Sequence, residues 1–407
     1  MNRRHFLATT LASVLASSVQ GADRPPRVLL RSAWQTVNIG DIGHTPGILR
    51  LFEDHLPHVE VRLWPSGIGE GVEELLRRRF PKLVILRGAA DIQTAFRECD
   101  FFLHGSGSGF VAQKDVARWR TETGKPYGIY GISLPSANPE GRELINGARF
   151  TYFRDGHSVA WAKGAGLTCP ILEFAPDGAF GVDLRNDEAA TAFLRANQLD
   201  EGKFLCVIPR LRFTPYWKIK AGRPFDESKH ARNEALKEHD HAPLRAAITA
   251  VVRETPMKVL VCPEDQSQME VGKTMLVDPL PEDVKARVVW REKYWLTDEA
   301  VSTYIRSAGL FGLEMHSPIM CIGNGVPAIV CRFVDQTFKG RMWRDIGLGD
   351  WLFDMDVEEE VARIVPTVLA MAKDPAAAKA RAMKAREFVQ QRQRETMQVL
   401  GKALASV

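Results

Sequence analysis

Short runs of aliphatic and β-branched residues recur along the chain, at spacings that leave room for one helix between them. The runs are continuous rather than alternating, which is typical of strands covered on both faces of a parallel sheet. We therefore expect strands at 27–31, 59–64, 101–103, 127–132, 150–153, 204–208, 258–262, 288–290, 309–312 and 328–331.

Helix-like stretches fill the intervals, with clear examples at 46–56, 69–79, 111–123, 243–254 and 298–307. Strands that alternate with helices predict doubly wound sheets. The pattern pauses over 183–201, where a polar helix at 187–197 is expected before strands resume. We therefore predict an α/β protein with two Rossmann-like doubly wound domains that face each other across a cleft.

The chain has 407 residues, more than one hydrophobic core usually holds. We predict an N-terminal Rossmann-like domain over 24–185 and a C-terminal one over 186–373. A helical segment rich in Ala, Lys, Arg and Gln is expected to follow at 374–407 as one or two exposed helices that can pack back over either domain. The polar stretch at 226–240 shows no clear period, and we expect a loop or lid near the cleft.

The first 23 residues have a different character. Arg3 and Arg4 precede an apolar run at 7–19, which is typical of a twin-arginine export leader. An amphipathic first helix is the alternative, but the run has too little charge for one. It is also too short to span a bilayer. We expect export to the periplasm or cell envelope, with no stable membrane span once the leader is removed.

Charge and cysteine content exclude some classes of function. The formal net charge is +4 among 54 basic and 50 acidic residues, and no basic arm concentrates it, so nucleic-acid binding is not predicted. Six cysteines lack any Cys-x-x-Cys pair and mostly sit in apolar runs, which favours buried thiols. His239 and His241 lie in a polar stretch, where histidines are usually solvated, and we expect neither a metal nor a cofactor.

Two glycine-containing turns follow strands in the first half. The first turn, at 38–46, opens the helix at Pro46, where Thr45 is a plausible N-cap and the free N–H groups suit a phosphate or carboxylate. The second turn, at 104–109, has glycines at three alternating positions, which favours contact between backbone and ligand. A capped tight turn and a flexible hairpin loop are the respective alternatives. The predicted acceptor-binding backbone cradle consists of Asn38, Gly40, Asp41, Gly105, Ser106 and Gly107.

Arg154, Asp155 and Ser158 follow the strand at 150–153. An arginine beside an aspartate forms an ion pair, and either Asp155 or Ser158 suits the start of the next helix as a cap. We interpret this group as structural, with ligand contact left open.

Arg210 and Arg212 stand among aromatic residues directly after the strand at 204–208. Guanidinium groups at the carboxyl end of a strand neutralise phosphates and carboxylates through forked hydrogen bonds. A charged surface loop is the alternative.

His316 lies between the strand at 309–312 and the one at 328–331, at the start of a short apolar helix. Ligands of open parallel sheets bind outside the carboxyl ends of the strands, where helix N-termini offer N–H donors. An imidazole at this place either donates to a phosphate or moves a proton, and the alternative is a core histidine. Lys339 follows the next strand and adds a cation.

Several of these features, taken in order, resemble the polysaccharide pyruvyl transferase family over about residues 28–355. The matching features are the Asn-x-Gly-Asp turn at 38–41, the glycine-rich turn at 105–109, Arg154-Asp155 with Ser158, Pro176-Asp177, and His316 with Gly325-Val326-Pro327 and Lys339. The resemblance implies a GT-B-like pair of Rossmann-type domains. It also implies transfer of a pyruvyl group from phosphoenolpyruvate to sugar hydroxyls, which gives a ketal.

The resemblance implies roles for single residues. His316 matches the family histidine proposed as the acid, and Arg210 or Arg212 matches an arginine that holds the donor. We predict that His316 is catalytic and that Arg210, Arg212, Lys339 and Ser317 bind the donor. The expected partners are an anionic donor like phosphoenolpyruvate and a glycan acceptor.

Two departures keep other functions open. The family commonly has Arg-Leu-His where this chain has Glu314-Met315-His316, and phosphoenolpyruvate is a cytoplasmic metabolite whereas the leader predicts export. One alternative is a GT-B-like glycosyltransferase that uses a nucleotide sugar, with Glu314 on a ribose. The other is a non-catalytic glycan-binding protein of the envelope.

Overall fold

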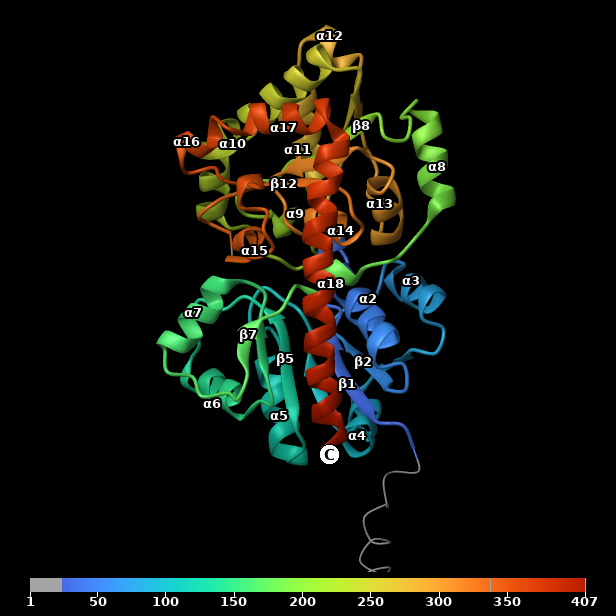
Figure 1. The fold of residues 1–407 in the computed structure, drawn as a ribbon, viewed down its shortest axis with the longest axis vertical. Coiled ribbons are helices and arrows are strands. Elements are labelled where there is room, and N and C mark those ends of the chain that lie inside the picture. Colours follow the sequence, from blue (N-terminus) through green and yellow to red (C-terminus); the bar gives the residue numbers. More distant parts are fainter. Residues whose placement is uncertain (1–23, 337, 407) are drawn as a thin grey trace, which may run out of the picture.

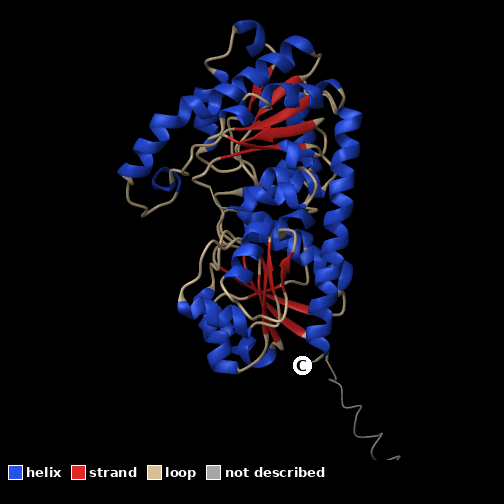
Figure 2. Ribbon diagram, turned by 60° about the vertical axis from the view of Figure 1, so that its left-hand side comes forward, coloured by secondary structure: helices blue, strands red, loops and turns tan. Residues whose placement is uncertain are grey.

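The computed structural model describes residues 24–336 and 338–406, so the predicted export leader at 1–23 lies outside the described residues. The described chain forms two lobes, stacked along the long axis in Figure 1. Each lobe is built around one parallel sheet, which helices cover on both faces (Figure 2). The prediction of two Rossmann-like α/β domains is confirmed.

The first lobe holds a seven-stranded sheet in the order β3-β2-β1-β4-β5-β6-β7. Its strands are β1 (Arg27–Ser32), β2 (Glu60–Pro65), β3 (Val84–Ile85), β4 (Phe101–His104), β5 (Tyr127–Ile132), β6 (Thr151–Phe153) and β7 (Leu172–Phe174). Its helices are α2 (Ile39–His55), α3 (Val72–Arg79), α4 (Ala89–Glu98), α5 (Gln113–Thr123), α6 (Pro139–Gly147), α7 (Gly156–Gly164) and the 3-10 turn η2 (Gly178–Gly181).

The second lobe holds a six-stranded sheet in the order β10-β9-β8-β11-β12-β13. Its strands are β8 (Phe204–Ile208), β9 (Lys258–Val261), β10 (Val288–Trp290), β11 (Gly309–Gly312), β12 (Ala328–Arg332) and β13 (Leu352–Asp354). The helical segments are α8 (Asp187–Ala196), α9 (Tyr216–Ile219), α10 (Glu227–Glu254), α11 (Gln268–Val271), the π-helical η3 (Gly272–Val277), α12 (Glu282–Lys285), α13 (Thr297–Tyr304), α14 (His316–Gly323), η4 (Phe338–Arg341), α15 (Met342–Asp345), η5 (Gly349–Trp351), α16 (Glu358–Val361), α17 (Ile364–Lys373) and α18 (Pro375–Ala405).

The strand order reverses direction once in each sheet, between β1 and β4 in the first lobe and between β8 and β11 in the second. All strand pairs in both sheets are parallel. Ligands of such sheets bind at these reversal points, outside the carboxyl ends of the strands. The loops after β1, β4, β8 and β11 are therefore where the fold directs a search for a site.

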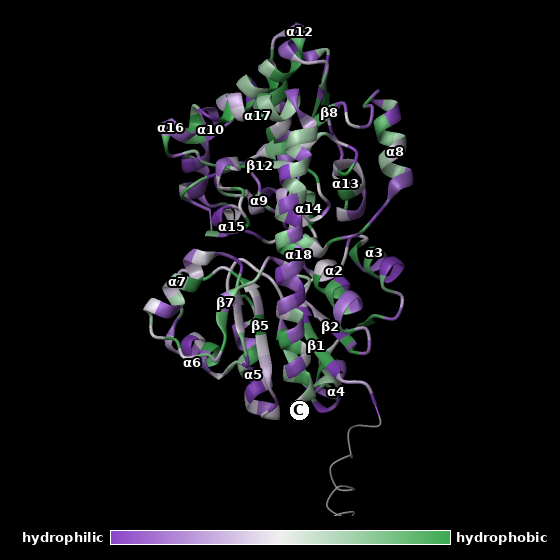
Figure 3. Cartoon of the chain, viewed as in Figure 1, coloured by the Kyte–Doolittle hydropathy of each residue, from purple (hydrophilic) through white to green (hydrophobic). Residues whose placement is uncertain are grey.

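The last helix, α18, joins the two lobes. It runs along both of them in Figure 1, and Figure 3 shows hydrophobic and hydrophilic residues along its whole length. Its Thr396 hydroxyl lies 3.0 Å from the hydroxyl of Tyr130, and Arg392 Nε donates to the carbonyl of Phe174 at 2.8 Å. The C-terminal segment, predicted as one or two helices that could pack back over either domain, is thus a single helix with one buried face.

Glycines of α2 allow close packing both within the first lobe, at Gly47, and against the second lobe, at Gly40. A Cβ at Gly47 would stand 1.9 Å from the carbonyl oxygen of Gly178, and one at Gly40 would stand 2.1 Å from Cβ of His316. Both positions therefore exclude any larger residue. The predicted helix start at Pro46 was wrong, because the side chain of Asn38 accepts hydrogen bonds from the Gly40 and Asp41 N–H groups and starts α2 at Ile39.

The polar stretch at 226–240 is also different from its prediction. It forms the first half of α10, with Asp226 as N-cap, rather than a loop or lid. Most of this half is exposed to solvent, so no apolar period marks it in the sequence. Among the described residues, no helix combines the length and the apolar character that crossing a bilayer requires.

Candidate active site

A cavity of about 610 Å³ opens between the lobes, where loops that follow β1, β4, β8, β11 and β12 meet. This is the place that the two strand-order reversals select. The first lobe contributes Gln35, Asn38, Asp41 and Ser108. The second lobe contributes among others Arg210, Arg212, Tyr216, Trp217, Phe225, His316, Asp335, Gln336 and Lys339.

His316 is the first residue of α14 and is almost fully buried at the bottom of this cavity. Its Nδ1 lies 3.0 Å from Oε1 of Glu264, whose Oε2 accepts the Ser317 N–H at 2.6 Å. Glu264 follows β9 and has no exposed side-chain surface. A carboxylate held in this way fixes the plane of the imidazole and leaves Nε2 as the nitrogen available to a ligand.

Lys339 stands beside the imidazole. Its Nζ lies 3.4 Å from Nδ1 and 3.5 Å from Nε2 of His316, and no carboxylate of the described residues lies within 4.0 Å of it. Burial and the charge of Lys339 hold the pKa of His316 well below its usual range. Burial likewise lowers the pKa of Lys339, although Glu314 opposes the shift. His316 is therefore neutral near pH 7 until an anion arrives.

A buried ion pair lies on the other side of the imidazole. Arg210 Nη1 donates to Oε2 of Glu314 at 2.6 Å, and Gln268 donates to Oε1 of the same carboxylate at 2.8 Å. Nε of Arg210 is buried and has no hydrogen-bond partner within the described chain. Burial raises the pKa of Glu314, and burial with the charge of Glu314 raises that of Asp265 to about 6.

These groups form one polar cluster, in which Arg210, His316 and Lys339 line the cavity and the two glutamates lie buried behind them. We refer to Arg210, Glu264, Glu314, His316 and Lys339 together as the floor of the cleft. Two carboxylates, two fixed cations and one imidazole offer donors for a phosphate or carboxylate and a route for a proton.

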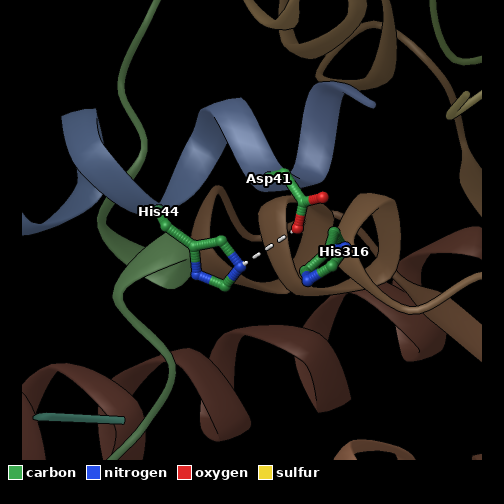
Figure 4. Close-up of side chains that lie close together, drawn as sticks. All are labelled: Asp41, His44 and His316. Atoms are coloured by element: carbon green, nitrogen blue, oxygen red, sulfur yellow. Dashed lines mark ion pairs between the residues drawn. The ribbon is translucent and has the colours of Figure 1, made fainter. Parts of the chain in front are cut away.

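Asp41 and His44 of α2 approach His316 from the first lobe, as Figure 4 shows. One ligand atom from each of the three lies within 4.8 Å of the others, and the two imidazoles meet edge to face with centroids 4.9 Å apart. This is a spacing that a divalent cation can contract around. The charge of Lys339 opposes a second cation there, and the expectation that the protein uses no metal stays a prediction.

His44 connects the floor to a buried polar group in the first lobe. Its Nδ1 lies 3.1 Å from Asp177, which also pairs with Arg154 at 2.5 Å. Burial opposes ionisation of Asp177, but His44 and Arg154 outweigh it and hold the pKa of Asp177 well below its usual range. Asp155 caps α7 through the Ser158 N–H, so the structural interpretation of this group agrees with the contacts.

Most residues of the predicted backbone cradle pack against other parts of the protein and do not line the cavity. Gly40 packs on His316, Ser106 accepts the Gly178 N–H at 2.8 Å, and Cβ atoms at Gly105 and Gly107 would meet Ser32 and Val111. The glycines of both turns allow close packing within the chain. Ser108 is the residue of the glycine-rich turn that lines the cavity. Asn38 and Asp41 do line it, although Asn38 is occupied in capping α2.

Two predicted donor-binding residues are engaged elsewhere. Asp240 binds the guanidinium of Arg212 through two hydrogen bonds of 2.9 Å, and Asp335 and Asp356 bind its Nη1. Ser317 is fully buried, and its hydroxyl accepts a hydrogen bond from Tyr304 at 3.2 Å. Arg212 lines the cavity but is neutralised by carboxylates of its own chain, and Ser317 faces the core, so these contacts do not favour the donor-binding roles of either, which stay predictions.

Glu264 and His44 were missed from the sequence. Glu264 follows β9 in Pro263-Glu264-Asp265, a polar end of a predicted strand in the position already used to select the other candidates. The same rule would have found it. His44 gives no comparable signal, because its role depends on the start of α2 at Ile39.

The family model for polysaccharide pyruvyl transferase matches residues 38–332, most of the chain. A search of the curated proteins finds no match.

Solved structures with a similar fold include Anabaena Alr3699/HepE in complex with UDP and glucose, at 12% identity and a TM-score of 0.54, covering 94% of this chain and 100% of that one. Another is Staphylococcus aureus MnaA with UDP, at 11% identity and a TM-score of 0.51, covering 89% and 91%. A third is a putative UDP-N-acetylglucosamine 2-epimerase from Listeria monocytogenes, at 13% and 0.52, covering 89% and 92%. These likenesses show the GT-B-like arrangement of the two domains.

Proposed function

The chain belongs to the polysaccharide pyruvyl transferase family, and from this premise we propose that it moves a pyruvyl group from phosphoenolpyruvate, or a related enol phosphate, to a glycan as a ketal. One observation carries the proposal. At the floor of the cleft, an imidazole lies beside a lysine with no carboxylate partner and an arginine with an unused donor, within the part of the chain that the structure describes.

Arg210 and Lys339 are the groups that bind the donor. A guanidinium with a free Nε suits a planar carboxylate or a phosphate, and the ammonium adds a point charge. Glu314 already compensates Arg210, so the net attraction comes mainly from Lys339 and from the proton that His316 gains. Glu314 stands where the family commonly has an arginine, but Arg210 compensates its charge and Gln268 binds its other oxygen, so repulsion of an anionic donor is small.

His316 supplies the proton. The donor brings negative charge to a histidine whose pKa is depressed in the free protein, so the pKa rises as the donor binds and the ring becomes an acid. Protonation of the methylene carbon makes the neighbouring carbon cation-like. One sugar hydroxyl adds there and loses its proton, and a second hydroxyl displaces phosphate and loses its own.

Glu264 acts as a positioning residue. It holds Nδ1 of His316 and stabilises the imidazolium without itself lining the cavity. Asp41 lies near the ring, lines the cavity and is available to receive protons from the acceptor hydroxyls, whereas His44 is buried 3.9 Å from Asp41.

Release of inorganic phosphate from phosphoenolpyruvate in the presence of a panel of oligosaccharides tests the proposal. We expect His316→Asn, whose amide retains a partner for Glu264, to lower kcat by roughly 10²- to 10⁴-fold with an unchanged melting temperature. His58→Asn, at an exposed position of the first lobe, is the matched control. Phosphate release that survives His316→Asn would refute the assignment.

A nucleotide-sugar glycosyltransferase is the second candidate, since two of the similar solved structures hold UDP. A protein with that activity gains thermal stability from UDP and UDP-sugars, whereas the proposed transferase gains it from phosphoenolpyruvate. Thermal unfolding measured with each of these ligands therefore distinguishes the two activities.

Export through the twin-arginine route is part of the proposal. The six cysteines are all buried and free, as suits a protein that folds before it is exported. Replacement of Arg3 and Arg4 by lysine is expected to leave the protein in the cytoplasmic fraction. Unchanged recovery from the envelope fraction would contradict this route.

A further inference from the structure

Above the floor, the cavity is walled by aromatic side chains from one segment. Trp217 stands on α9 and Phe225 lies just before α10, and both line the same cavity as His316. Their rings lie edge to face with centroids 5.3 Å apart, and His230 completes the group at 5.3 Å from Phe225. We refer to Trp217, Phe225 and His230 as the rim of the cleft.

The rim is partly exposed although it is aromatic. Phe225 keeps 59% of its surface accessible, whereas Trp217 and His230 are half-buried beside it. Aromatic rings that gather at a cavity with one ring exposed are typical of a binding surface, unlike a single exposed ring elsewhere. Phe388 on α18 is also exposed, to 46%, but it does not line the cavity. The two phenylalanines are therefore similarly exposed, and only Phe225 lies at the cavity.

The segment that carries the rim, residues 213–230, is held by hydrogen bonds at both of its ends. Asn233 of α10 accepts the Phe213 N–H at 2.9 Å and donates to its carbonyl at 2.8 Å. The Thr214 hydroxyl donates to Asp265 at 3.1 Å, and Asp226 caps α10. The aromatic rings are thus presented on a fixed backbone, which lowers the ordering cost of binding.

The cavity has room for a second occupant beside a small donor. About 610 Å³ is the volume of a site for a drug-sized molecule, and a three-carbon enol phosphate fills only the part near the floor. The remaining space is bounded by the rim. Because the cavity is continuous, a molecule lying against the rim reaches the reacting centre.

The polar groups around the rim suit a neutral polyhydroxylated ligand. Lys229 pairs with Asp226 at 2.6 Å, and Asp335 is shared by Arg212 and Arg232. Arg223 also lines the cavity and has no carboxylate within 4.0 Å among the described residues, so the rim offers paired donors and acceptors together with one unpaired cation. The apolar C–H faces of a sugar ring pack on aromatic rings while its hydroxyls bond to such mixed polar groups.

We propose that Trp217 and Phe225 form the acceptor subsite, on which a sugar residue of the glycan packs with its reacting hydroxyls directed to the floor. The identity of this occupant rests on the proposed function. The geometry also places the ketal at a residue close to the rim, so the rest of the glycan extends outward past Phe225.

Calorimetric titration without donor tests the subsite. The probes are tetrasaccharides of glucose, galactose, mannose and N-acetylglucosamine. We expect one of them to bind, and Phe225→Ala and Trp217→Ala each to weaken it roughly threefold to tenfold, since aromatic packing contributes about 0.5–1.5 kcal/mol. Phe388→Ala is the matched control and should not change the affinity.

Three results would overturn the assignment. They are no binding of any probe by the wild type, equal affinities of wild type and Phe225→Ala, and binding of UDP that the two rim variants weaken instead. Phe225 is exposed, so its variant folds even where Trp217→Ala does not, and Trp217→Phe should retain most of the affinity. Glycan binding at the rim without phosphate release from phosphoenolpyruvate would reject the proposed function and leave the subsite standing.

Discussion

The floor and the rim of the cleft differ in burial and in the chemistry of their side chains. The floor consists of buried ionisable groups, each placed by at least one contact of 2.6–3.5 Å to another floor residue or to the residues around it. The rim consists of aromatic rings that pack on one another, of which Phe225 is exposed and Trp217 and His230 are half-buried.

The difference follows from what each surface has to recognise. Charge that develops during a reaction is stabilised best by groups already oriented and shielded from water. A glycan is neutral and presents C–H faces, so flat apolar surface serves it without buried charge. A buried ionic site loses much when one partner is removed, whereas an aromatic surface loses a modest amount per ring.

The largest effect is expected on stability from Arg210→Met. It leaves the fully buried Glu314 without its cation, and breaking such a pair costs about 3–5 kcal/mol. The free energy of unfolding from urea titration measures it. Arg210→Met combined with Glu314→Gln should recover most of the loss, because no unpaired charge remains. A single variant as stable as the wild type would show that the floor is not an electrostatic unit.

Glu264→Gln is expected to lower kcat roughly 100-fold, because the amide no longer stabilises the imidazolium of His316. The pH at which activity declines should also move to a lower value, a shift that a merely structural role does not produce. Glu270→Gln changes an exposed acid of the same lobe and serves as control. Equal pH profiles for Glu264→Gln and wild type would reject the positioning role.

Donor binding is expected to depend on pH through His316. Its pKa is depressed in the free protein by burial and Lys339, and the anionic donor raises it, so the complex binds more protons than the free protein. Affinity therefore increases as pH falls through neutrality, by up to about tenfold per unit for one proton. His316→Asn should retain only the slope that the donor's own titration gives, and an unchanged slope would contradict proton uptake by the histidine.

Most of the fold was predictable because the inner strands are continuous apolar runs. The inner strands β5, β8 and β11 have the predicted bounds, and so does the edge strand β10. The strands that the sequence did not reveal are β3, β7 and β13, each of two or three residues and each at an edge of its sheet. Edge strands bury less surface and are short, so their pattern is weak. The domain boundary at 185/186 stays a prediction, and it falls between β7 and β8.

The site was predictable in part, and Arg210 and Arg212 show where the limit lies. They are two residues apart and both follow β8, so the sequence makes them equivalent. Their partners decide the difference: Arg210 meets one carboxylate and retains an unused donor, whereas Arg212 is held by Asp240, Asp335 and Asp356. Those carboxylates come from distant segments, which local pattern cannot bring together.

The smallest effect is expected at the link between floor and rim. The Thr214 hydroxyl, which belongs to the rim segment, donates to Asp265 beside the floor. Thr214→Val removes one hydrogen bond and should cost about 1 kcal/mol of stability. It should weaken the acceptor more than the donor, because the rim segment loses an anchor while Arg210 and Lys339 keep theirs. Thr214→Ser retains the hydroxyl and should behave as the wild type. Equal losses of affinity for donor and acceptor would mean that floor and rim respond as one rigid unit. The two would then differ only in the chemistry of their side chains.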